Sequence, residues 1–566
     1  MSDTITSLTG RVWRIQSGKR DHRDINDLVA TLAKNRGVEN LNDFAKPSLE
    51  RHMPDPFIFI DMEKAVVRIA DAIKSGQKIA ILGDYDVDGV SSIAILVKFL
   101  SAVGANFCYS VPNRMDEGYG LSIGSIEKYK DCLLVAVDCG SGSLTELAYA
   151  KEHGIDAVVI DHHKISVIPD AVAVVNPHRP DESGDYQYLC ATGLVFLCVY
   201  ALNRMLKLSG FYEGKKEPAI SDYLDLVALA SVCDVVELVG LNRVFVFAGL
   251  KLIRDRKNFG IDAILSFYRG AQIASETISF FLGPRLNAAG RMSSADISVR
   301  LLTTENPIEA RKNALLLEDL NRQRQIMECE ILEKANSMVD ESLNFICLYH
   351  ENWHAGVMGI VAGRLKEKFN KPTIVISHDK NGMGLASCRS VVDLDLSKLI
   401  AKGIQLGIIS SGGGHAMAAG FSIEINKIDR LVEFLKAEIR HEILPQEAYA
   451  DCILDLDMLT FDLLKAVSVL EPFGVGNRHP KFIIPNVTTS SHKIVGKNHM
   501  TMLLHDDKGN SLRTIAFKAA DSNLGRVIIE SQNPINALGT CVISCWKNER
   551  YLCLQLEDVS DCTPEA

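Results

Sequence analysis

The sequence predicts an α/β protein of several domains, the first of which is built on a mostly parallel, doubly wound sheet. Between about residues 55 and 300, short apolar runs alternate with helix-like segments, as is typical of βαβ units. A chain of 566 residues is too long for a single core, so two to four domains are expected. From about residue 455 the pattern changes to short β segments, which indicates a separate small barrel.

The predicted strands of the parallel sheet are short and apolar, as expected for strands that are buried on both faces. Helical patterns lie between them, for example at 90–103 and 143–153. The first 50 residues look mostly helical, with 24–35 as the clearest helix. The apolar stretch 188–202 is too short to span a bilayer, and we interpret it as a buried helix. The five strands are expected at 78–82, 106–111, 133–137, 157–160 and 172–175.

A long amphipathic helix is predicted next, from Glu309 to about Val339, with Pro307 suited to its first turn. A helix of this length often connects two domains. A second, smaller α/β unit follows, with expected strands at 345–349 and 373–377 around a helix at 356–369. Five more β segments indicate an OB-fold, a barrel that commonly binds single strands. They are expected at 481–487, 499–505, 511–517, 536–544 and 551–559.

These patterns divide the chain into five parts. We expect an N-terminal helical segment, a catalytic α/β domain, a connector helix, a smaller α/β domain and an OB-like barrel that binds nucleic acid. Their expected bounds are 1–50, 51–300, 301–342, 343–450 and 451–566.

The composition limits the class of protein. An apolar content of 47% with 23% charged residues is ordinary for a soluble enzyme. The polar N-terminus lacks a signal-peptide pattern. The 14 cysteines form no C-x-x-C pair, which argues against a zinc ribbon or a disulfide framework and fits a reducing cytosol. The net charge of −10 argues against nonspecific coating of nucleic acid, but a local basic groove can coexist with an acidic exterior.

Acidic side chains stand where the first predicted strand ends. Asp84, Asp86 and Asp88 lie between Gly83 and Gly89. Spacing by two places the three carboxylates on one side of an extended backbone, where they repel one another unless cations neutralise them. The glycines permit a tight turn from strand to helix, so the segment suits metal ligation and contact with phosphate. The alternative is an acidic surface loop with a helix cap.

A second motif, Asp161-His162-His163, follows the predicted strand 157–160. Consecutive side chains on an extended backbone point in opposite directions, so we expect the two imidazoles to differ in role. One would bind metal and the other would face the substrate phosphate, while Asp161 would orient a ring nitrogen. The alternative is a solvated turn with a helix cap.

Two more acids occupy similar positions. Asp138 ends the strand at 133–137, and Asp234 closes the apolar stretch 226–232. Neighbouring parallel strands are ~5 Å apart, so Asp138 could bridge two ions that are ~3.5–4 Å apart. Asp234 could add a carboxylate from a helix end. Each acid is weak evidence alone, but four such segments within one α/β region indicate a two-metal hydrolytic centre.

The order of these motifs resembles the DHH phosphoesterase superfamily and, within it, the RecJ family of single-strand-specific 5′→3′ DNA exonucleases. The superfamily motifs are 83–89, Asp138, 161–163 and Asp234. The segments similar to RecJ are VPNR (111–114), EGYG (117–120), GPRLNAAGR (283–291), HAGVMGIVAGR (354–364), SCRS (387–390), GGH (413–415) and PFGVGN (472–477). The match covers nearly the whole chain.

The resemblance implies two divalent metal ions. The implied ligands are Asp86, Asp88, Asp138, His162 and Asp234, with Asp138 bridging; His163 would act beside them, and Asp84 would be a ligand or a close acid. Many superfamily members have a histidine four residues before the position of Asp86, where this chain has Leu82. Asp84 or water is the expected substitute. A carboxylate in place of that imidazole favours Mg²⁺ or Mn²⁺ over zinc.

The second α/β unit resembles the DHH-associated domain. Its turn at 412–415 would approach phosphate through the backbone N–H groups of Gly413 and Gly414, with His415 facing the metal site. Ser387 and Arg389, together with Arg114, are candidates for holding the 5′ phosphate of DNA, because the planar fork of arginine binds phosphate bidentately. A structural glycine turn and surface ion pairs are the alternatives.

Three further residues are candidates for contact with the rest of the strand. Arg285 and Arg291 would contact its backbone, and Tyr119 would stack on a base, because single-strand channels use aromatic platforms. For Tyr119, ordinary packing is the alternative.

The resulting hypothesis is metal-dependent hydrolysis of single-stranded DNA from its 5′ end to mononucleotides. A cleft too narrow for duplex would select single strands, and the barrel would hold the incoming strand. The first alternative is a phosphoesterase of the same superfamily that acts on short oligonucleotides or nucleotides, which would not need the barrel. The second is a non-catalytic DNA-binding scaffold, against which the retained acids and histidines argue.

The family also implies a setting for the protein. It suggests recombination, mismatch repair and replication restart in a bacterial cytoplasm, together with a helicase and single-strand-binding protein. No membrane association is expected. A monomer is expected because the chain has no coiled-coil heptad run.

Overall fold

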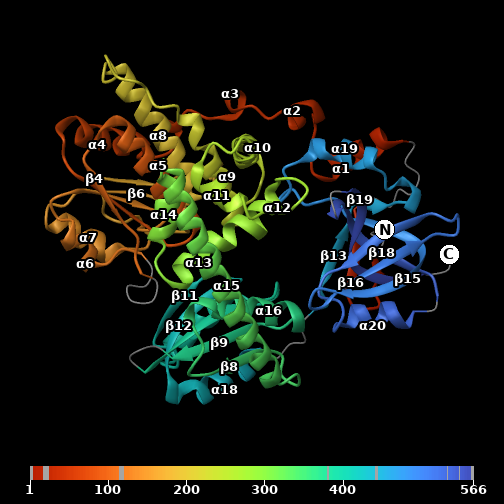
Figure 1. Cartoon of the computed structure of the whole chain (residues 1–566). Coiled ribbons are helices and arrows are strands. Elements are labelled where there is room, and N and C mark those ends of the chain that lie inside the picture. Colours follow the sequence, from red (N-terminus) through yellow and green to blue (C-terminus); the bar gives the residue numbers. More distant parts are fainter. Residues whose placement is uncertain are drawn as a thin grey trace.

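The computed structural model describes residues 4–16, 24–113, 120–378, 382–439, 444–531, 533–546 and 549–562. It contains an α/β domain, a smaller α/β domain below it and a β-barrel to the side, with one long helix running between the two α/β domains (Figure 1). The predicted fold class is therefore confirmed.

The first domain is built on a five-stranded sheet in the order β4-β3-β5-β6-β7, and all its pairings are parallel. The five predicted strands are confirmed, with end shifts of a residue. Their bounds are β3 (Ile79–Gly83), β4 (Phe107–Ser110), β5 (Leu133–Val137), β6 (Ala157–Ile160) and β7 (Ala173–Val175). From β3 the chain continues to β4 on one side of it and then returns to β5 on its other side. A topological switch point therefore lies between β3 and β5.

Helices cover both faces of this sheet. Ile81 and Val135 pack into a large core with α4, α5, α8 and α9, whereas Ala80 and Leu134 pack into a smaller core with α6 and α7. Burial on both faces explains why the strands lack polar alternation. The helices are α4 (Met62–Ser75), α5 (Val87–Val103), α6 (Ile123–Lys128), α7 (Leu144–Glu152), α8 (Ala191–Leu208), α9 (Leu224–Cys233), α10 (Gly240–Arg254), α11 (Phe259–Leu265), α12 (Ser275–Thr277), the π-helical turn η3 (Ile278–Leu282), α13 (Gly283–Met292) and α14 (Asp296–Thr303).

Helix α8 contains most of the apolar stretch noted in the sequence. Among the described residues, it alone is long and apolar enough to cross a membrane, and 72% of it is buried inside the protein. The prediction of a buried helix is confirmed.

The connector helix α15 (Pro307–Met338) is present as predicted, with Pro307 in its first turn. The side chain of Asn306 caps it by accepting from the N–H groups of Ile308 and Glu309. Its first half packs in the core of the first domain, and its second half, with Ile331, packs in a core that belongs to α16 of the second domain. Helix α15 thus contributes side chains to the cores of both α/β domains.

The second domain has a five-stranded sheet in the order β11-β12-β10-β9-β8, in which only β8 and β9 are parallel. The two expected strands and the helix between them are confirmed. The glycine run at 412–414 is not a turn, as the sequence suggested, but an edge strand whose backbone pairs with β12. The elements are β8 (Ile346–Tyr349), α16 (Ala355–Phe369), β9 (Thr373–His378), β10 (Met383–Arg389), α17 (Leu396–Gln405), β11 (Ser411–Gly414), β12 (Ala418–Glu424) and α18 (Ile428–Glu438).

The C-terminal barrel closes through the pairing of its first strand with its fourth, β15 with β18. All five predicted segments are strands. The first is longer than expected because it continues through an irregularity between Ser490 and Lys493. The elements are β14 (Cys452–Ile453), α19 (Phe461–Val467), β15 (Phe482–Val495), β16 (His499–His505), β17 (Ser511–Ala516), α20 (Asn523–Glu530), β18 (Ile535–Trp546) and β19 (Glu549–Asp561). Short 3₁₀ turns elsewhere are Pro56–Ile58, Ile220–Tyr223, Ile425–Lys427, Leu456–Met458 and Ser468–Leu470.

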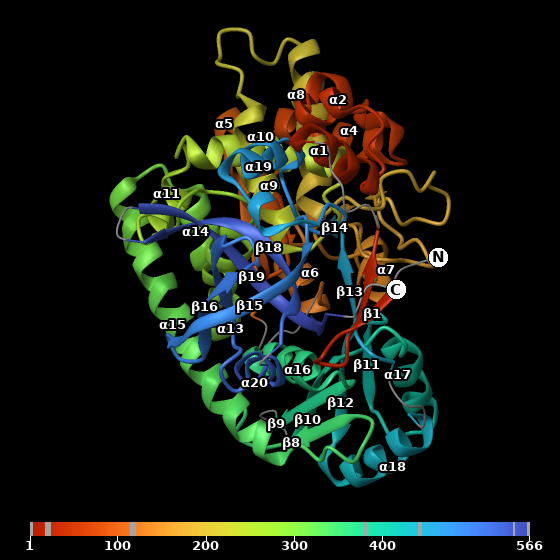
Figure 2. The same ribbon diagram turned by 90° about the vertical axis from the view of Figure 1, so that its right-hand side faces the viewer.

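The N-terminal segment is less helical than the sequence suggested. Strands β1 (Thr4–Thr6) and β2 (Val12–Ile15) form a hairpin, and β13 (Glu447–Ala450) pairs with β2. Trp13 is fully buried and donates its indole N–H to Asp558 of β19 at 2.9 Å, so the hairpin lies against the barrel (Figure 2). The hairpin strands have only three and four residues, and β13 is distant in sequence, so the local pattern did not show this sheet. Three helices follow: α1 (Ile25–Asn35), as predicted, α2 (Leu41–Ala45) and α3 (Leu49–His52).

A buried carboxyl in α9 makes the stability of this domain depend on pH. Burial raises the pKa of Asp225 from an ordinary 3.8 to about 6, so the folded state holds the proton more tightly than the unfolded state. The free energy of unfolding should therefore fall by ~3 kcal/mol as the pH rises from about 4 to about 6, between the pKa of the unfolded state and that of the folded state. We expect Asp225→Asn to raise the thermal midpoint at pH 7.5 and to give no gain near pH 4. The exposed neighbour Asp222 supplies the control, Asp222→Asn, which should show no such dependence. An equal effect of Asp225→Asn at both pH values would contradict this account.

Candidate metal centre

The predicted acids and histidines meet at the carboxyl edge of the parallel sheet, on both sides of the topological switch. Asp84 follows β3, Asp138 follows β5, and His162 follows β6. Asp234 is the residue that ends α9. Because parallel strands all end at one edge, segments far apart in sequence deliver their side chains to one place.

The ligand atoms form two groups that share a neighbour. One group comprises Asp84, Asp86 and Asp138, and the other comprises Asp88, His162 and Asp234; within each, the ligand atoms lie within 4.8 Å of one another. Asp138 also lies within the same distance of His162 and His163. Asp138 therefore stands between the two groups, where a bridging carboxylate would be placed.

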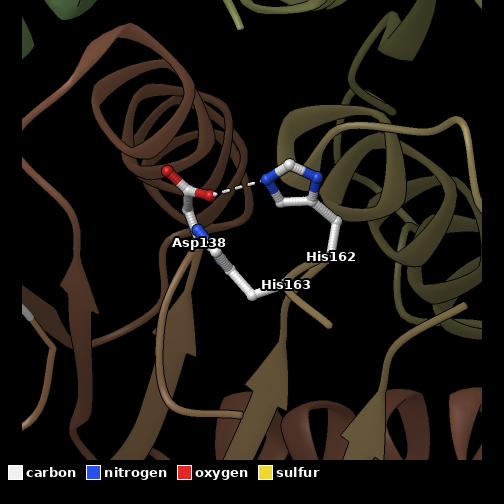
Figure 3. Close-up of side chains that lie close together, drawn as sticks. All are labelled: Asp138, His162 and His163. Atoms are coloured by element: carbon white, nitrogen blue, oxygen red, sulfur yellow. Dashed lines mark ion pairs between the residues drawn. The ribbon is translucent and has the colours of Figure 1, made fainter. Parts of the chain in front are cut away.

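His162 lies at the centre of the second group. Its Nε2 is 3.4 Å from Asp138 Oδ1, 3.7 Å from Asp88 Oδ2 and 3.6 Å from Asp234 Oδ2. Figure 3 shows the ring of His162 directed at Asp138 from the segment that follows β6. Three carboxylates from three separate segments thus converge on one imidazole nitrogen.

The sequence suggested that the acidic loop after β3 is extended, but only its first part is. Helix α5 already begins at Val87, and the carboxylate of Asp86 caps it by accepting from the N–H groups of Asp88 and Gly89 at 2.8 and 3.2 Å. A Cβ at Gly89 would lie 2.4 Å from the carbonyl oxygen of Asp84, so only glycine fits there. The early helix start divides the three acids between the two groups. Asp84 and Asp86 lie with Asp138, whereas Asp88 lies with His162 and Asp234.

The carboxylates are buried close together, and their pKa values show the consequence. Burial and the charges of Asp88, Asp86, Asp84 and Asp234 raise the pKa of Asp138 well above its ordinary value. Burial and the charge of Asp88 also raise the pKa of Asp86, and the same causes raise that of Asp234 to about 9. Asp138 has a left-handed backbone with φ 58°, which is uncommon outside glycine and clusters at functional sites. A set of oxygen donors with one imidazole fits hard divalent cations.

Asp161 orients His163 rather than His162. It accepts from His163 Nδ1 at 2.8 Å and from the backbone N–H groups of His162, His163 and Ser141. Burial alone would raise the pKa of Asp161, but the hydrogen bond and charge of His163 hold it below its ordinary range. In turn, burial would lower the pKa of His163, but Asp161 raises it to about 9. The two imidazoles therefore differ in their contacts: His162 faces the acids, and His163 is a cation held by Asp161.

Helix α13 carries the GPRLNAAGR motif and links the acidic loop to the second domain. A Cβ at Gly290 would lie 2.8 Å from the carbonyl oxygen of Tyr85, so the helix packs directly on the loop. Arg291 donates to the carbonyl of Gly356 in α16 at 3.1 Å. Arg285 pairs with Glu318 of α15 at 2.6 Å and lies over the ring of Phe281. The predicted contacts of both arginines with DNA stay predictions.

The second domain places its candidate residues around α16 and the exposed edge strand. Ser387 and Arg389 of β10 face Gly359 of α16, where a Cβ would lie 3.0 Å from Arg389 Nη2 and 3.8 Å from Ser387 Oγ. Gly413 and Gly414 belong to β11, and His415 follows.

His415 lies near the histidines of the first domain. Burial and the positive charges of His163, Lys164 and His162 lower the pKa of His415, so these groups are close enough to interact. Arg114 and Tyr119 lie outside the described residues.

A cavity of about 660 Å³ adjoins Asp234 and lies between both α/β domains and the segment that leads into the barrel. Its lining includes Phe280 of η3, 80% exposed, and Arg478 from that segment. Val235, directly after Asp234, also lines it and has φ 61°, which is strained for a β-branched residue. The sequence interpretation missed these residues. Two motifs noted in the sequence do line the cavity: PFGVGN through Phe473, Gly474 and Val475, and GPRLNAAGR through Gly283, Pro284, Asn287 and Arg291.

Three stretches of the chain match known family profiles. They are "DHH family, N-terminal domain" over residues 78–231, "DHHA1 domain" over 342–441 and "RecJ OB domain" over 450–558. The single-stranded-DNA-specific exonuclease RecJ of Salmonella typhimurium is 32% identical over 515 residues, which cover 86% of this chain and 88% of that protein. The protein of the same name from Bacillus subtilis is 29% identical over 574 residues, which cover 97% of this chain and 70% of that protein.

Solved structures give the same result. RecJ from Thermus thermophilus in complex with Mn²⁺ superposes with a TM-score of 0.81 at 26% identity, covering 98% of this chain and 80% of that one. A structure of the same protein in complex with Mg²⁺ superposes with a TM-score of 0.75 at 25% identity, covering 98% and 79%.

The crowding of carboxylates predicts opposite effects of one substitution with and without metal. Asp138→Asn removes a buried charge and keeps a residue that tolerates the left-handed backbone. We expect a thermal midpoint several degrees above that of the wild type in chelator, and little or no further rise when Mn²⁺ is added. The control is Asp71→Asn at an exposed position of α4, which should respond to Mn²⁺ as the wild type does. A full Mn²⁺-dependent rise in Asp138→Asn would show that Asp138 is not needed for ion binding.

Proposed function

The chain belongs to the RecJ family of single-stranded-DNA-specific exonucleases, and we propose that it hydrolyses single-stranded DNA from the 5′ end to mononucleotides. The observation that carries this proposal is the pair of ligand groups at the carboxyl edge of the sheet, with Asp138 in one group and 3.4 Å from His162 of the other. Family membership and the added barrel favour this function over a phosphoesterase for short oligonucleotides, and the complete set of acids favours it over a silent scaffold.

Two divalent ions, Mn²⁺ or Mg²⁺, fit the two ligand groups. Asp84, Asp86 and Asp138 would hold one ion, and Asp88, His162, Asp234 and Asp138 would hold the other. Such ions lower the pKa of bound water and neutralise charge that develops on the phosphate. In this account Asp84 takes the place of the family histidine that Leu82 replaces.

The second domain would hold the end of the strand. Ser387 and Arg389, together with Arg114, would bind the 5′ phosphate and so set the distance to the cleaved bond. His163, a cation held by Asp161, would face the phosphate from the first domain, and His415 from the second. A phosphate held by both domains needs a free strand end, which supports the exonuclease mode and the preference for single strands.

The cavity beside Asp234 would receive the strand that follows the cleaved bond. Its basic side chains include Arg291, Arg324 and Arg478, and no carboxylate pairs with Arg478 among the described residues. Phe280 offers an exposed ring on a π-helical turn, a type of distortion that is frequent at functional sites. The barrel lies beyond and would hold the incoming strand.

We further propose the biological setting that the family suggests. The protein would act in recombination and repair in the cytoplasm, as a monomer, on strands that a helicase opens and that single-strand-binding protein covers. The domain limits near residues 50, 300, 342 and 450 are part of the same proposal.

Polarity and the 5′-phosphate pocket can be tested together. A single-stranded 40-mer, labelled separately at each end, is digested with Mn²⁺ by the wild type and by Arg389→Ala. We expect the 5′ label to appear first, as mononucleotide. Arg389→Ala should lose about 10- to 100-fold in kcat/KM on 5′-phosphorylated substrate, the value of one or two charge-assisted hydrogen bonds.

The control for this assay is Arg430→Ala, at an exposed position of α18, which should match the wild type. Early release of the 3′ label would overturn the pocket assignment. Equal digestion of duplex and single strands would overturn the narrow cleft.

The role of Phe280 predicts a split between binding and turnover. Loss of one stacked base costs ~1–3 kcal/mol, so Phe280→Ala should raise KM for a 20-mer by about 10-fold while kcat changes little. Phe280→Tyr should retain the wild-type KM. The control is Phe247→Ala, which removes an exposed ring on α10, away from the cavity. If the KM for the 20-mer is unchanged in Phe280→Ala, the strand does not stack there.

A further inference from the structure

The carboxylate of Asp88 is held by the first turn of α8. Its Oδ1 accepts from the backbone N–H of Thr192 at 2.8 Å and from the Thr192 hydroxyl at 2.5 Å. Its Oδ2 accepts from the backbone N–H of Ala191 at 2.8 Å. Cys190, the residue at the cap position of α8, makes no side-chain cap bond, so Asp88 supplies the cap from a different segment.

The hydroxyl of Thr192 has a second hydroxyl beside it. Its Oγ1 lies 3.0 Å from the hydroxyl oxygen of Ser92 in α5. It also lies 2.9 Å from the main-chain carbonyl oxygen of Asp88, compared with 2.5 Å from Oδ1. A hydroxyl carries one proton, and the carboxylate is both the nearer and the stronger acceptor, so we assign that proton to Oδ1 and let Ser92 donate to Thr192. Thr192 and Ser92 are fully buried, so water cannot take the place of either hydroxyl.

These contacts make the two oxygens of Asp88 unequal. Oδ1 receives two donors from Thr192, whereas Oδ2 receives one and is the oxygen that faces His162, at 3.7 Å. The side chain cannot rotate about its last bond without breaking the bonds to α8. Asp88 is therefore fixed with a single oxygen presented to the ligand group.

We propose that Thr192 is a positioning residue that holds Asp88 as a one-oxygen ligand and thereby favours Mn²⁺ or Mg²⁺ over Ca²⁺ at this position. The inference rests on the two-ion centre proposed above. Mg²⁺ demands near-ideal octahedral coordination, whereas Ca²⁺ takes six to eight oxygens and often binds a carboxylate through both. Because Oδ1 of Asp88 is bonded to the start of α8, only Oδ2 faces the ligand group. Ca²⁺ therefore cannot bind this carboxylate through both oxygens.

The test compares Thr192→Val, which keeps the shape and loses the hydroxyl, with Thr192→Ser, which keeps the hydroxyl. Binding of Mn²⁺ to the full chain is measured without DNA by the electron paramagnetic resonance signal of free Mn²⁺, and Ca²⁺ is titrated in competition. We expect Thr192→Val to weaken one of the two Mn²⁺ sites by about 10- to 100-fold, as is typical when a partner of a metal ligand is lost. Its affinity for Ca²⁺ should hold or rise, so the ratio of Mn²⁺ to Ca²⁺ affinity falls. Thr192→Ser should keep both affinities.

The outcomes separate this inference from the proposed function. Unchanged Mn²⁺ and Ca²⁺ affinities in a folded Thr192→Val protein would overturn the positioning role, and so would a loss that Thr192→Ser shares. A wild type that binds two Mn²⁺ ions but leaves single-stranded DNA intact would overturn the proposed function and leave the role of Thr192 standing. If Thr192→Val does not fold, Ser92→Ala replaces it, because it removes the donor to Thr192. A smaller shift in the same direction is then expected, and no shift refutes the proposal.

Discussion

The mutual repulsion of buried carboxylates is the constraint on which the rest of this structure depends. Asp84, Asp86, Asp88, Asp138 and Asp234 lie together at one sheet edge. Burial and neighbouring charges raise the pKa values of Asp86, Asp138 and Asp234. The fold offsets part of this cost with donors. Asp86 accepts from the first turn of α5, Asp88 accepts from the first turn of α8, and His162 lies among the acids. The remaining negative charge is what gives the site its affinity for divalent cations.

The same edge determines how the domains are joined. Helix α13 packs on the acidic loop through Gly290 and bonds to α16 through Arg291, and α15 shares the cores of both α/β domains. The residues proposed to hold the strand end, Ser387 and Arg389, face that same α16. The distance between the proposed ion ligands and the proposed phosphate pocket is therefore set by packed helices rather than by a flexible linker, as a defined cutting position would require.

The barrel adds a surface but also completes the cavity. The chain that enters it, with Phe473 and Arg478, lines the same space as Phe280 and Val235 of the first domain. The N-terminal hairpin secures the barrel through Trp13, which donates to a carboxylate of the last barrel strand. Both ends of the described chain thus take part in placing the barrel and the cavity, the proposed strand-binding surfaces, relative to the ligand groups.

The sequence alone determined the parallel sheet, the connector helix, the barrel and the identities of the acids and histidines, because strand burial and motif order are local signals. Family likeness also implied a bridging role for Asp138, which lies between the two ligand groups. Only the tertiary structure decided that Asp84 joins Asp86 while Asp88 joins His162, because that division depends on where α5 begins. The tertiary structure alone showed that Asp161 is hydrogen-bonded to His163, that Thr192 is hydrogen-bonded to Asp88, and that β2 pairs with β13. These are contacts between segments distant in the chain, whose pairing no local pattern encodes.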